Sequence, residues 1–167
     1  MDHLFLETKL LADDAGAISG MAWKFDEADR VGDVIEKGAF SNLTLPIPML
    51  FGHDQNEPIG TWDATNEKSD GLHIEGKMLI DDVVRAREVR ALVKSGAVRG
   101  ISIGFITKKS NARPGGGRTI KQLELLEVSL VTLPMHPGAK VTSAKSAVEA
   151  LSIAAVINRA TAQLAAR

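Results

Sequence analysis

Two short segments decide the fold of this chain: residues 100–105 read Gly-Ile-Ser-Ile-Gly-Phe, and residues 126–131 read Leu-Glu-Val-Ser-Leu-Val. In both, apolar residues alternate with polar or small ones at a period of two, which is typical of a β-strand with one buried face. A glycine-rich loop lies between them. We therefore predict two long strands, over 98–108 and 119–133, that pair as an antiparallel hairpin.

The phase of this alternation places Ser102 and Glu127 on one face of the predicted hairpin. If the apolar side chains of both strands pack on the same core, these two polar side chains emerge together on the opposite face. Gly104 follows on the same face as Ser102. Because glycine lacks a Cβ, we interpret Gly104 as clearing space there for a substrate backbone.

The rest of the chain predicts a mainly β protein with helices (α+β). Before residue 80, three strands are expected, followed by a hairpin whose turn lies near residues 68–71. Asp81 or Asp82 is expected to cap a helix that ends at about Lys94. The predicted strands before this helix cover residues 4–11, 17–25, 30–40, 59–62 and 72–79.

A change of pattern near the C-terminus divides the chain into two parts. Residues 1–142 are expected to form the β-rich domain, and residues 143–167 an Ala-rich C-terminal helix. The apolar stripe of that helix is too short to predict a coiled coil. It leaves three roles open: packing on the domain, binding a partner or a second copy of the chain, and acting as a detachable tail.

Composition excludes several classes of function. With 20 basic and 21 acidic residues, the net charge of −1 offers no basic surplus for a nucleic-acid partner. The absence of cysteine excludes a disulfide scaffold, a thiolate zinc site and a cysteine nucleophile. No stretch approaches the roughly 20 apolar residues of a membrane span, and the N-terminus lacks the pattern of a signal peptide. A cytoplasmic location without membrane association is therefore the default expectation.

A third polar residue completes a set of reactive groups. His53, within Phe-Gly-His-Asp at residues 51–54, offers an imidazole beside the hydroxyl of Ser102 and the carboxylate of Glu127. A serine hydroxyl becomes a nucleophile when an imidazole takes its proton, and a carboxylate orients that imidazole and stabilises its charged form. The set predicts a serine peptidase, while spacing alone does not place His53 near Ser102.

Each of these residues also has an ordinary structural interpretation. His53 and Asp54 fit a turn, or half of a metal site. Glu127 fits an ion pair with Arg99 or Lys121. The remaining histidines lack the spacing of a metal cage. A serine peptidase that works through an acyl-enzyme needs no metal and no organic cofactor, so none is expected.

Taken in order, the motifs of this chain resemble those of the prohead maturation proteases of tailed bacteriophages. The resemblance covers roughly residues 25–139 and includes Gly-Ala-Phe at 38–40. The other matching motifs are Phe-Gly-His-Asp at 51–54, Pro-Ile-Gly at 58–60, Gly-Ile-Ser-Ile-Gly-Phe at 100–105 and Leu-Glu-Val-Ser-Leu-Val-Thr-Leu-Pro at 126–134.

This resemblance implies the fold of the herpesvirus assembly protease, an antiparallel β-barrel with flanking helices. It also implies Ser102 as the nucleophile, His53 as the general base and Glu127 as the third member of a catalytic triad. In the herpesvirus relatives the third member is a second histidine. The alternatives for that position in this chain are Asp54, His73 and His136.

The resemblance further implies a serine endopeptidase enclosed in an assembling procapsid in the host cytoplasm. Its substrates would be the major capsid protein, the scaffold segment and the protease itself, with the tail after about Thr142 as a self-cleavage or docking segment. The alternative is a non-catalytic module of the same fold that binds capsid or scaffold proteins through its C-terminal helix. The presence of all three reactive residues favours the peptidase.

Overall fold

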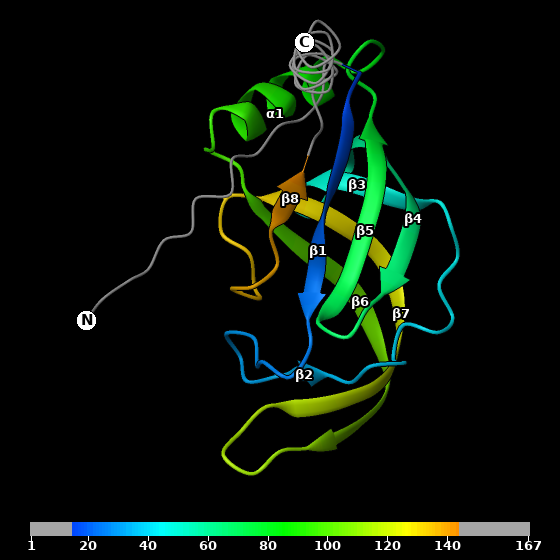
Figure 1. Cartoon of the computed structure of the whole chain (residues 1–167), viewed down its shortest axis with the longest axis vertical. Coiled ribbons are helices and arrows are strands. Elements are labelled where there is room, and N and C mark those ends of the chain that lie inside the picture. The colour runs from blue at the N-terminus through cyan, green and yellow to red at the C-terminus, as the bar shows by residue number, and fades with distance from the viewer. Residues whose placement is uncertain (1–14, 144–167) are drawn as a thin grey trace, which may run out of the picture.

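The computed structural model describes residues 15–143, and within them the chain forms eight strands and one helix (Figure 1). The mainly β class predicted from the sequence is confirmed. The elements are β1 (Ala17–Lys24), β2 (Val34–Ile35), β3 (Ile47–Phe51), β4 (Asp54–Glu67), β5 (Gly71–Met78), α1 (Val84–Lys94), β6 (Gly100–Ala112), β7 (Arg118–Val131) and β8 (Val141–Ser143).

The strands belong to one mixed sheet with the order β2-β7-β3-β4-β5-β1-β8, and β6 pairs with β7. Most pairs are antiparallel, whereas β7 runs parallel to both β2 and β3. Among the described residues no ladder joins β8, the last strand of the sheet, to β6; the contact there is an isolated bridge between Gly100 of β6 and Lys140, just before β8. The predicted closed barrel is therefore not confirmed.

The long hairpin β6–β7 has the antiparallel pairing that the alternation predicted. Ser102 lies opposite Ser129, and Gly104 lies opposite Glu127. Residues directly opposite each other in an antiparallel pair point to the same face, so Ser102 and Glu127 share a face of the sheet. The hairpin β4–β5 is also confirmed, with its turn between Glu67 and Gly71.

The hydrophobic core joins the sheet to α1. Ala86, Val89 and Val93 of the helix are fully buried, and α1 contacts β4 and β5. Trp62 of β4 is also fully buried and donates its indole N–H to the backbone carbonyl of Val128 on β7, 3.0 Å away. This bond ties the stretch of β7 that follows Glu127 to the core.

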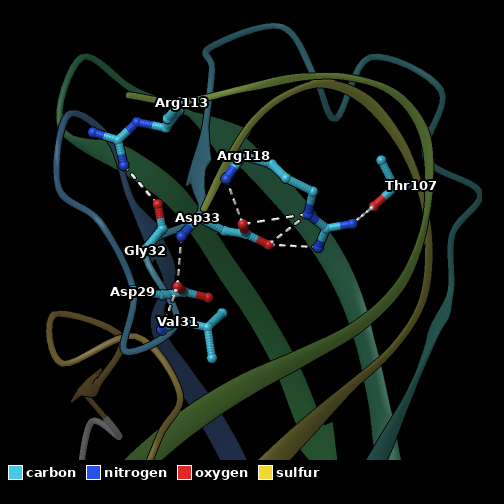
Figure 2. Close-up of polar contacts among 7 residues, drawn as sticks. All are labelled: Asp29, Val31, Gly32, Asp33, Thr107, Arg113 and Arg118. Atoms are coloured by element: carbon cyan, nitrogen blue, oxygen red, sulfur yellow. Dashed lines mark hydrogen bonds and ion pairs between the residues drawn. The ribbon is translucent and has the colours of Figure 1, made fainter. Parts of the chain in front are cut away.

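The strand predicted over residues 30–40 is mostly wrong, since only β2 forms there. Before it, the Oδ1 atom of Asp29 accepts hydrogen bonds from the backbone N–H groups of Val31 and Asp33, at 3.0 and 2.9 Å (Figure 2). Gly32, at φ 89°, takes the left-handed conformation that glycine adopts most easily. A side chain that bonds its own backbone in this way competes with the strand ladder and produces a turn.

The helix α1 begins later than predicted. Its N-cap is Val83, which makes no side-chain capping hydrogen bond, so the predicted capping by Asp81 or Asp82 is wrong. The backbone N–H of Val83 donates to the carbonyl of Leu79 at 2.8 Å, so a hydrogen-bonded turn precedes the helix. The predicted end at Lys94 is confirmed.

Several predictions fall on residues that the structure does not describe. The strand predicted over residues 4–11 lies outside the described residues. So does the C-terminal helix, apart from residue 143, and with it the division of the chain at that point. Within residues 15–143, no helix is both long enough and apolar enough to cross a membrane.

Candidate active site

His53 occupies a tight turn between β3 and β4, where Phe51 pairs with Asp54. The two central residues of this turn, Gly52 and His53, have φ values of 66° and 65°. A two-residue hairpin turn with positive φ at both positions suits the twist of its flanking strands, but it is uncommon for a residue that is not glycine. The turn is held to β7, since Gly52 donates its N–H to the carbonyl of Leu130 at 3.0 Å.

The imidazole of His53 is bonded to Glu127. The distance between Nδ1 of His53 and Oε1 of Glu127 is 2.7 Å, while the His53 side chain is 44% exposed and the Glu127 side chain 13% exposed. This hydrogen bond raises the pKa of His53 above its ordinary value, and partial burial opposes the rise. The pair is therefore arranged as a carboxylate that orients an imidazole and favours its charged form.

Ser129 contacts both members of this pair. Its hydroxyl donates to Oε2 of Glu127 at 2.6 Å, and its oxygen accepts the backbone N–H of His53 at 3.0 Å. Ser129 was assigned no role from the sequence. The signal that could have found it is the strand alternation, since Ser129 follows Glu127 by two residues on β7 and therefore points to the same face.

Gly104 has a different role from the one predicted. A Cβ atom at this position would lie 2.2 Å from Oε1 and 2.9 Å from Cδ of Glu127. No side chain fits there unless the carboxylate moves. The space above Gly104 is thus filled by the carboxylate of Glu127, and we correct the interpretation that it is left for a substrate.

Ser102 is buried, at 6% exposure, and lies directly across the hairpin from Ser129. It lines a small cavity of about 30 Å³ together with Trp23 and His136. Within residues 15–143, the structure shows no hydrogen bond between Ser102 and His53. The structure thus brings His53 and Glu127 into contact, and it places Ser102 beside Ser129, the residue that contacts both.

The alternatives to Glu127 have other partners. The carboxylate of Asp54 accepts hydrogen bonds from Asn56, and His73 is bonded to Asp70 at 2.9 Å. His136 is buried, with its ring centroid 4.5 Å from that of Trp23. Glu127 pairs with His53, and not with Arg99 or Lys121 as the structural interpretation had it. Among the described residues, no group of three His, Asp or Glu side chains is arranged to hold a metal ion.

The fold is similar to that of a solved viral protease. A crystal structure of the KSHV protease in complex with a hexapeptide phosphonate inhibitor superposes with a TM-score of 0.52, over 75% of this chain and 63% of that one. The sequence identity is 16%, so this likeness concerns the fold alone.

Sequence relatives come from bacteriophages. The capsid polyprotein of Pseudomonas phage PAJU2 is 39% identical over 150 aligned residues, and the match covers 84% of this chain and 22% of the polyprotein. The prohead protease of Enterobacteria phage HK97 is 33% identical over 138 aligned residues, and the match covers 78% of this chain and 61% of that protein. The prohead protease of Escherichia phage T5 is 33% identical over 126 aligned residues, and the match covers 71% of this chain and 58% of that protein. This chain thus matches less than two thirds of the length of each.

A comparison with whole protein families also gives a match over most of the chain. A sequence model described as the caudovirus prohead serine protease matches residues 5–153. That range contains the turn of His53, the hairpin β6–β7 and every other described element. The chain therefore belongs to the caudovirus prohead serine protease family.

Proposed function

We propose that this chain is a serine endopeptidase that processes capsid proteins during prohead maturation, with Ser102 as nucleophile, His53 as general base and Glu127 as the residue that orients the base. The observation that carries the proposal is the 2.7 Å hydrogen bond between His53 Nδ1 and Glu127 Oε1. It occurs on the face of the hairpin to which Ser102 also belongs. The family and the names of the relatives from phages HK97 and T5 support the same function.

The reaction would proceed through an acyl-enzyme. With Nδ1 held by Glu127, the other ring nitrogen of His53, Nε2, is the atom that takes the proton of Ser102. The Ser102 oxygen bonds to the peptide carbonyl carbon, the C–N bond breaks, and the same proton passes to the leaving amine. Water then gives a proton to His53 and its oxygen bonds to the ester carbonyl carbon; the bond to the Ser102 oxygen breaks, the new carboxyl group leaves, and the proton taken from water passes from His53 to Ser102. Ser102 is buried and is not bonded to His53 in the free protein, so the proposal requires the Ser102–His53 bond to form when substrate binds.

The proposed substrates are the major capsid protein and its scaffold segment, and the proposed place of action is the interior of the assembling procapsid. The similarity to a capsid polyprotein supports a link between this protease and capsid proteins. Processing of the chain's own C-terminal tail, and association of the chain through that tail, remain proposals about residues outside the described range.

The experiment is co-expression of the full chain with the major capsid protein of the same phage, followed by intact-mass measurement of both products. The wild type is expected to shorten the capsid protein, and Ser102→Ala is expected to leave it intact, because the triad loses most of its rate when any member is lost. The mass of the shortened product identifies the cleaved bond. The same masses show whether the chain loses its own C-terminus.

A matched control is Ser110→Ala, on the same strand as Ser102 but far from the His53 turn. It is expected to behave as the wild type. An intact capsid protein with the wild type, in cells where shells visibly assemble, would overturn the enzymatic proposal in favour of the non-catalytic module. Equal processing by Ser102→Ala would remove Ser102 from the mechanism.

A further inference from the structure

Ser129 is fully buried, yet its hydroxyl uses both its donor and its acceptor. The hydrogen goes to Oε2 of Glu127 at 2.6 Å, and the oxygen accepts the backbone N–H of His53 at 3.0 Å. A buried hydroxyl needs at least one partner to offset its desolvation. Here the partners are His53, the proposed base, and Glu127, its orienting group. Ser129 therefore connects these two residues in addition to their direct hydrogen bond.

The accepting contact fixes the backbone of His53. This residue has φ 65°, a left-handed conformation that costs free energy for a residue with a Cβ. Its N–H is held by Ser129, and the N–H of the preceding Gly52 is held by the carbonyl of Leu130. Two consecutive backbone donors of the turn are thus bonded to consecutive residues of β7. The position of the His53 ring therefore depends on the strand that carries Glu127.

The donating contact fixes the carboxylate of Glu127. A glutamate side chain has one more rotatable bond than an aspartate, so a single hydrogen bond to His53 leaves its carboxylate free to turn about its terminal bond. Ser129 holds Oε2, which leaves Oε1 facing Nδ1 of His53. On the other side, Gly104 offers no Cβ that would push this carboxylate away.

We propose that Ser129 is a positioning residue for the His53–Glu127 pair, acting through its hydroxyl on both members at once. This inference rests on the proposed function, since it assigns a role within that site. Ser129 itself does not take part in bond making. Its part is to keep the imidazole and the carboxylate in one geometry while Ser102, directly opposite on β6, reacts.

The test combines kinetics with a titration that needs no activity. The full chain is prepared as wild type, Ser129→Ala, Ser129→Thr and Ser129→Val. Threonine and valine have the same shape and fit a strand equally, so this pair differs only by the hydroxyl. Peptidase rates are measured on the capsid protein, thermal unfolding is followed for each variant, and the ring signals of the four histidines are titrated by NMR. His53→Gln assigns the signal of His53.

We expect Ser129→Ala and Ser129→Val to lower kcat on the order of 100-fold, as a small displacement of a catalytic group does, with little change in KM. We also expect the pKa of His53 to fall toward its ordinary value in both, because the Glu127 hydrogen bond that raises it is no longer held in place. Ser129→Thr should restore both the rate and the titration relative to Ser129→Val.

Other results overturn the proposal. If the valine and alanine variants unfold at lower temperature but keep the wild-type kcat and the wild-type titration of His53, Ser129 is a structural residue only. If threonine and valine behave alike, the hydroxyl is not the active group. If the wild type shows no peptidase activity at all, the proposed function fails, and the titration of His53 still decides whether Ser129 positions the pair.

Discussion

The strand β7 carries a charged pair near each of its ends, and the two pairs differ in what they are built to do. At its start, Arg118 binds Asp33 through its backbone N–H at 2.7 Å and through its guanidinium, with Nε 3.1 Å from Oδ2 (Figure 2). Toward its end, Glu127 binds His53. The first pair joins two groups that are charged at neutral pH, whereas the second contains a group that titrates there.

The two pairs also differ in the burial and in the pKa of their titratable groups. Asp33 is 4% exposed, and the hydrogen bond with Arg118 holds the pKa of its carboxyl below the ordinary value, so its charge persists into acid. His53 is half exposed, and its pKa is raised by Glu127. The pair at Asp33 therefore braces the turn of residues 29–33 against the β6–β7 hairpin. The pair at His53 stays accessible and able to gain or lose a proton.

The largest effect should come from His53→Ala, which we expect to lower activity strongly while changing stability little. We expect a loss on the order of 10⁴-fold in kcat/KM, because the variant lacks the proposed general base, and the members of a catalytic triad act as a unit. The unfolding temperature should change little, since the side chain is 44% exposed. The matched control is His73→Ala, which removes a histidine that is also bonded to a carboxylate, through Nε2 to Asp70, and should keep full activity. Equal losses in the two variants would contradict the assignment.

The next effect should come from Glu127→Gln, which keeps the shape of the side chain but removes its charge. We expect a loss on the order of 10³-fold in kcat, smaller than that of His53→Ala. The activity of the wild type should rise with pH through the pKa of His53, because the base must be neutral. Since Glu127 raises that pKa, the rise in the variant should be centred at lower pH. An unshifted pH profile would show that Glu127 does not act on His53.

The raised pKa of His53 also predicts that stability depends on pH, in the direction opposite to activity: activity rises with pH, whereas the stabilisation by the pair decreases. A raised pKa in the folded state means that the His53–Glu127 pair stabilises the fold below the ordinary pKa of about 6.5, and that this contribution is lost as pH rises through the folded value. The difference in unfolding free energy between wild type and Glu127→Gln should therefore shrink from pH 5 to pH 9. Urea unfolding at both pH values measures it, and a difference that grows with pH would contradict the pairing.

Asp33→Asn should affect stability and leave catalysis nearly unchanged, which is the reverse of His53→Ala. We expect a loss of roughly 1 to 3 kcal/mol in the free energy of unfolding at pH 7, since a buried group loses charge-assisted hydrogen bonds. The pKa of Asp33 is lowered in the fold, so its contribution is present above about 3.9 and is lost as pH falls through the folded value. Urea unfolding of this variant and of Asp63→Asn, at an exposed position, provides the measurement and its control. Equal stability of the two variants at pH 7 would contradict a bracing role.

The smallest effect should come from Arg113→Ala. Its guanidinium donates to the carbonyl of Gly32 at 2.6 Å and adds one further bond between the hairpin and the turn (Figure 2). We expect a loss of about 0.5 to 1.5 kcal/mol in the free energy of unfolding, less than for Asp33→Asn, because the carbonyl regains a water partner. If Arg113→Ala loses more free energy of unfolding than Asp33→Asn, then Arg113, and not Asp33, makes the larger contribution to holding the turn on the hairpin.

The parts of this structure that the sequence predicted well depend on local patterns. The alternation around Ser102 and Glu127 sufficed for their common face, since the hairpin that joins them is continuous in the chain. The position of His53 was not predictable, because it depends on the parallel pairing of β3 with β7, two strands that are distant in sequence. The turn of residues 29–33 was missed because the side chain of Asp29 replaces the ladder there.

The parallel pairing of β3 with β7 also sets the order in which the site is completed as the chain folds. His53 and Glu127 are 74 positions apart, whereas the hairpin β4–β5 closes through local contacts. Distant pairings form more slowly than local ones, since the long loop between them must be closed first. During synthesis, an unfinished chain that already contains Ser102 still lacks the carboxylate that orients His53. We expect the reactive centre to be assembled only when the last long strand joins the sheet, so that partly made chains are inert toward their neighbours.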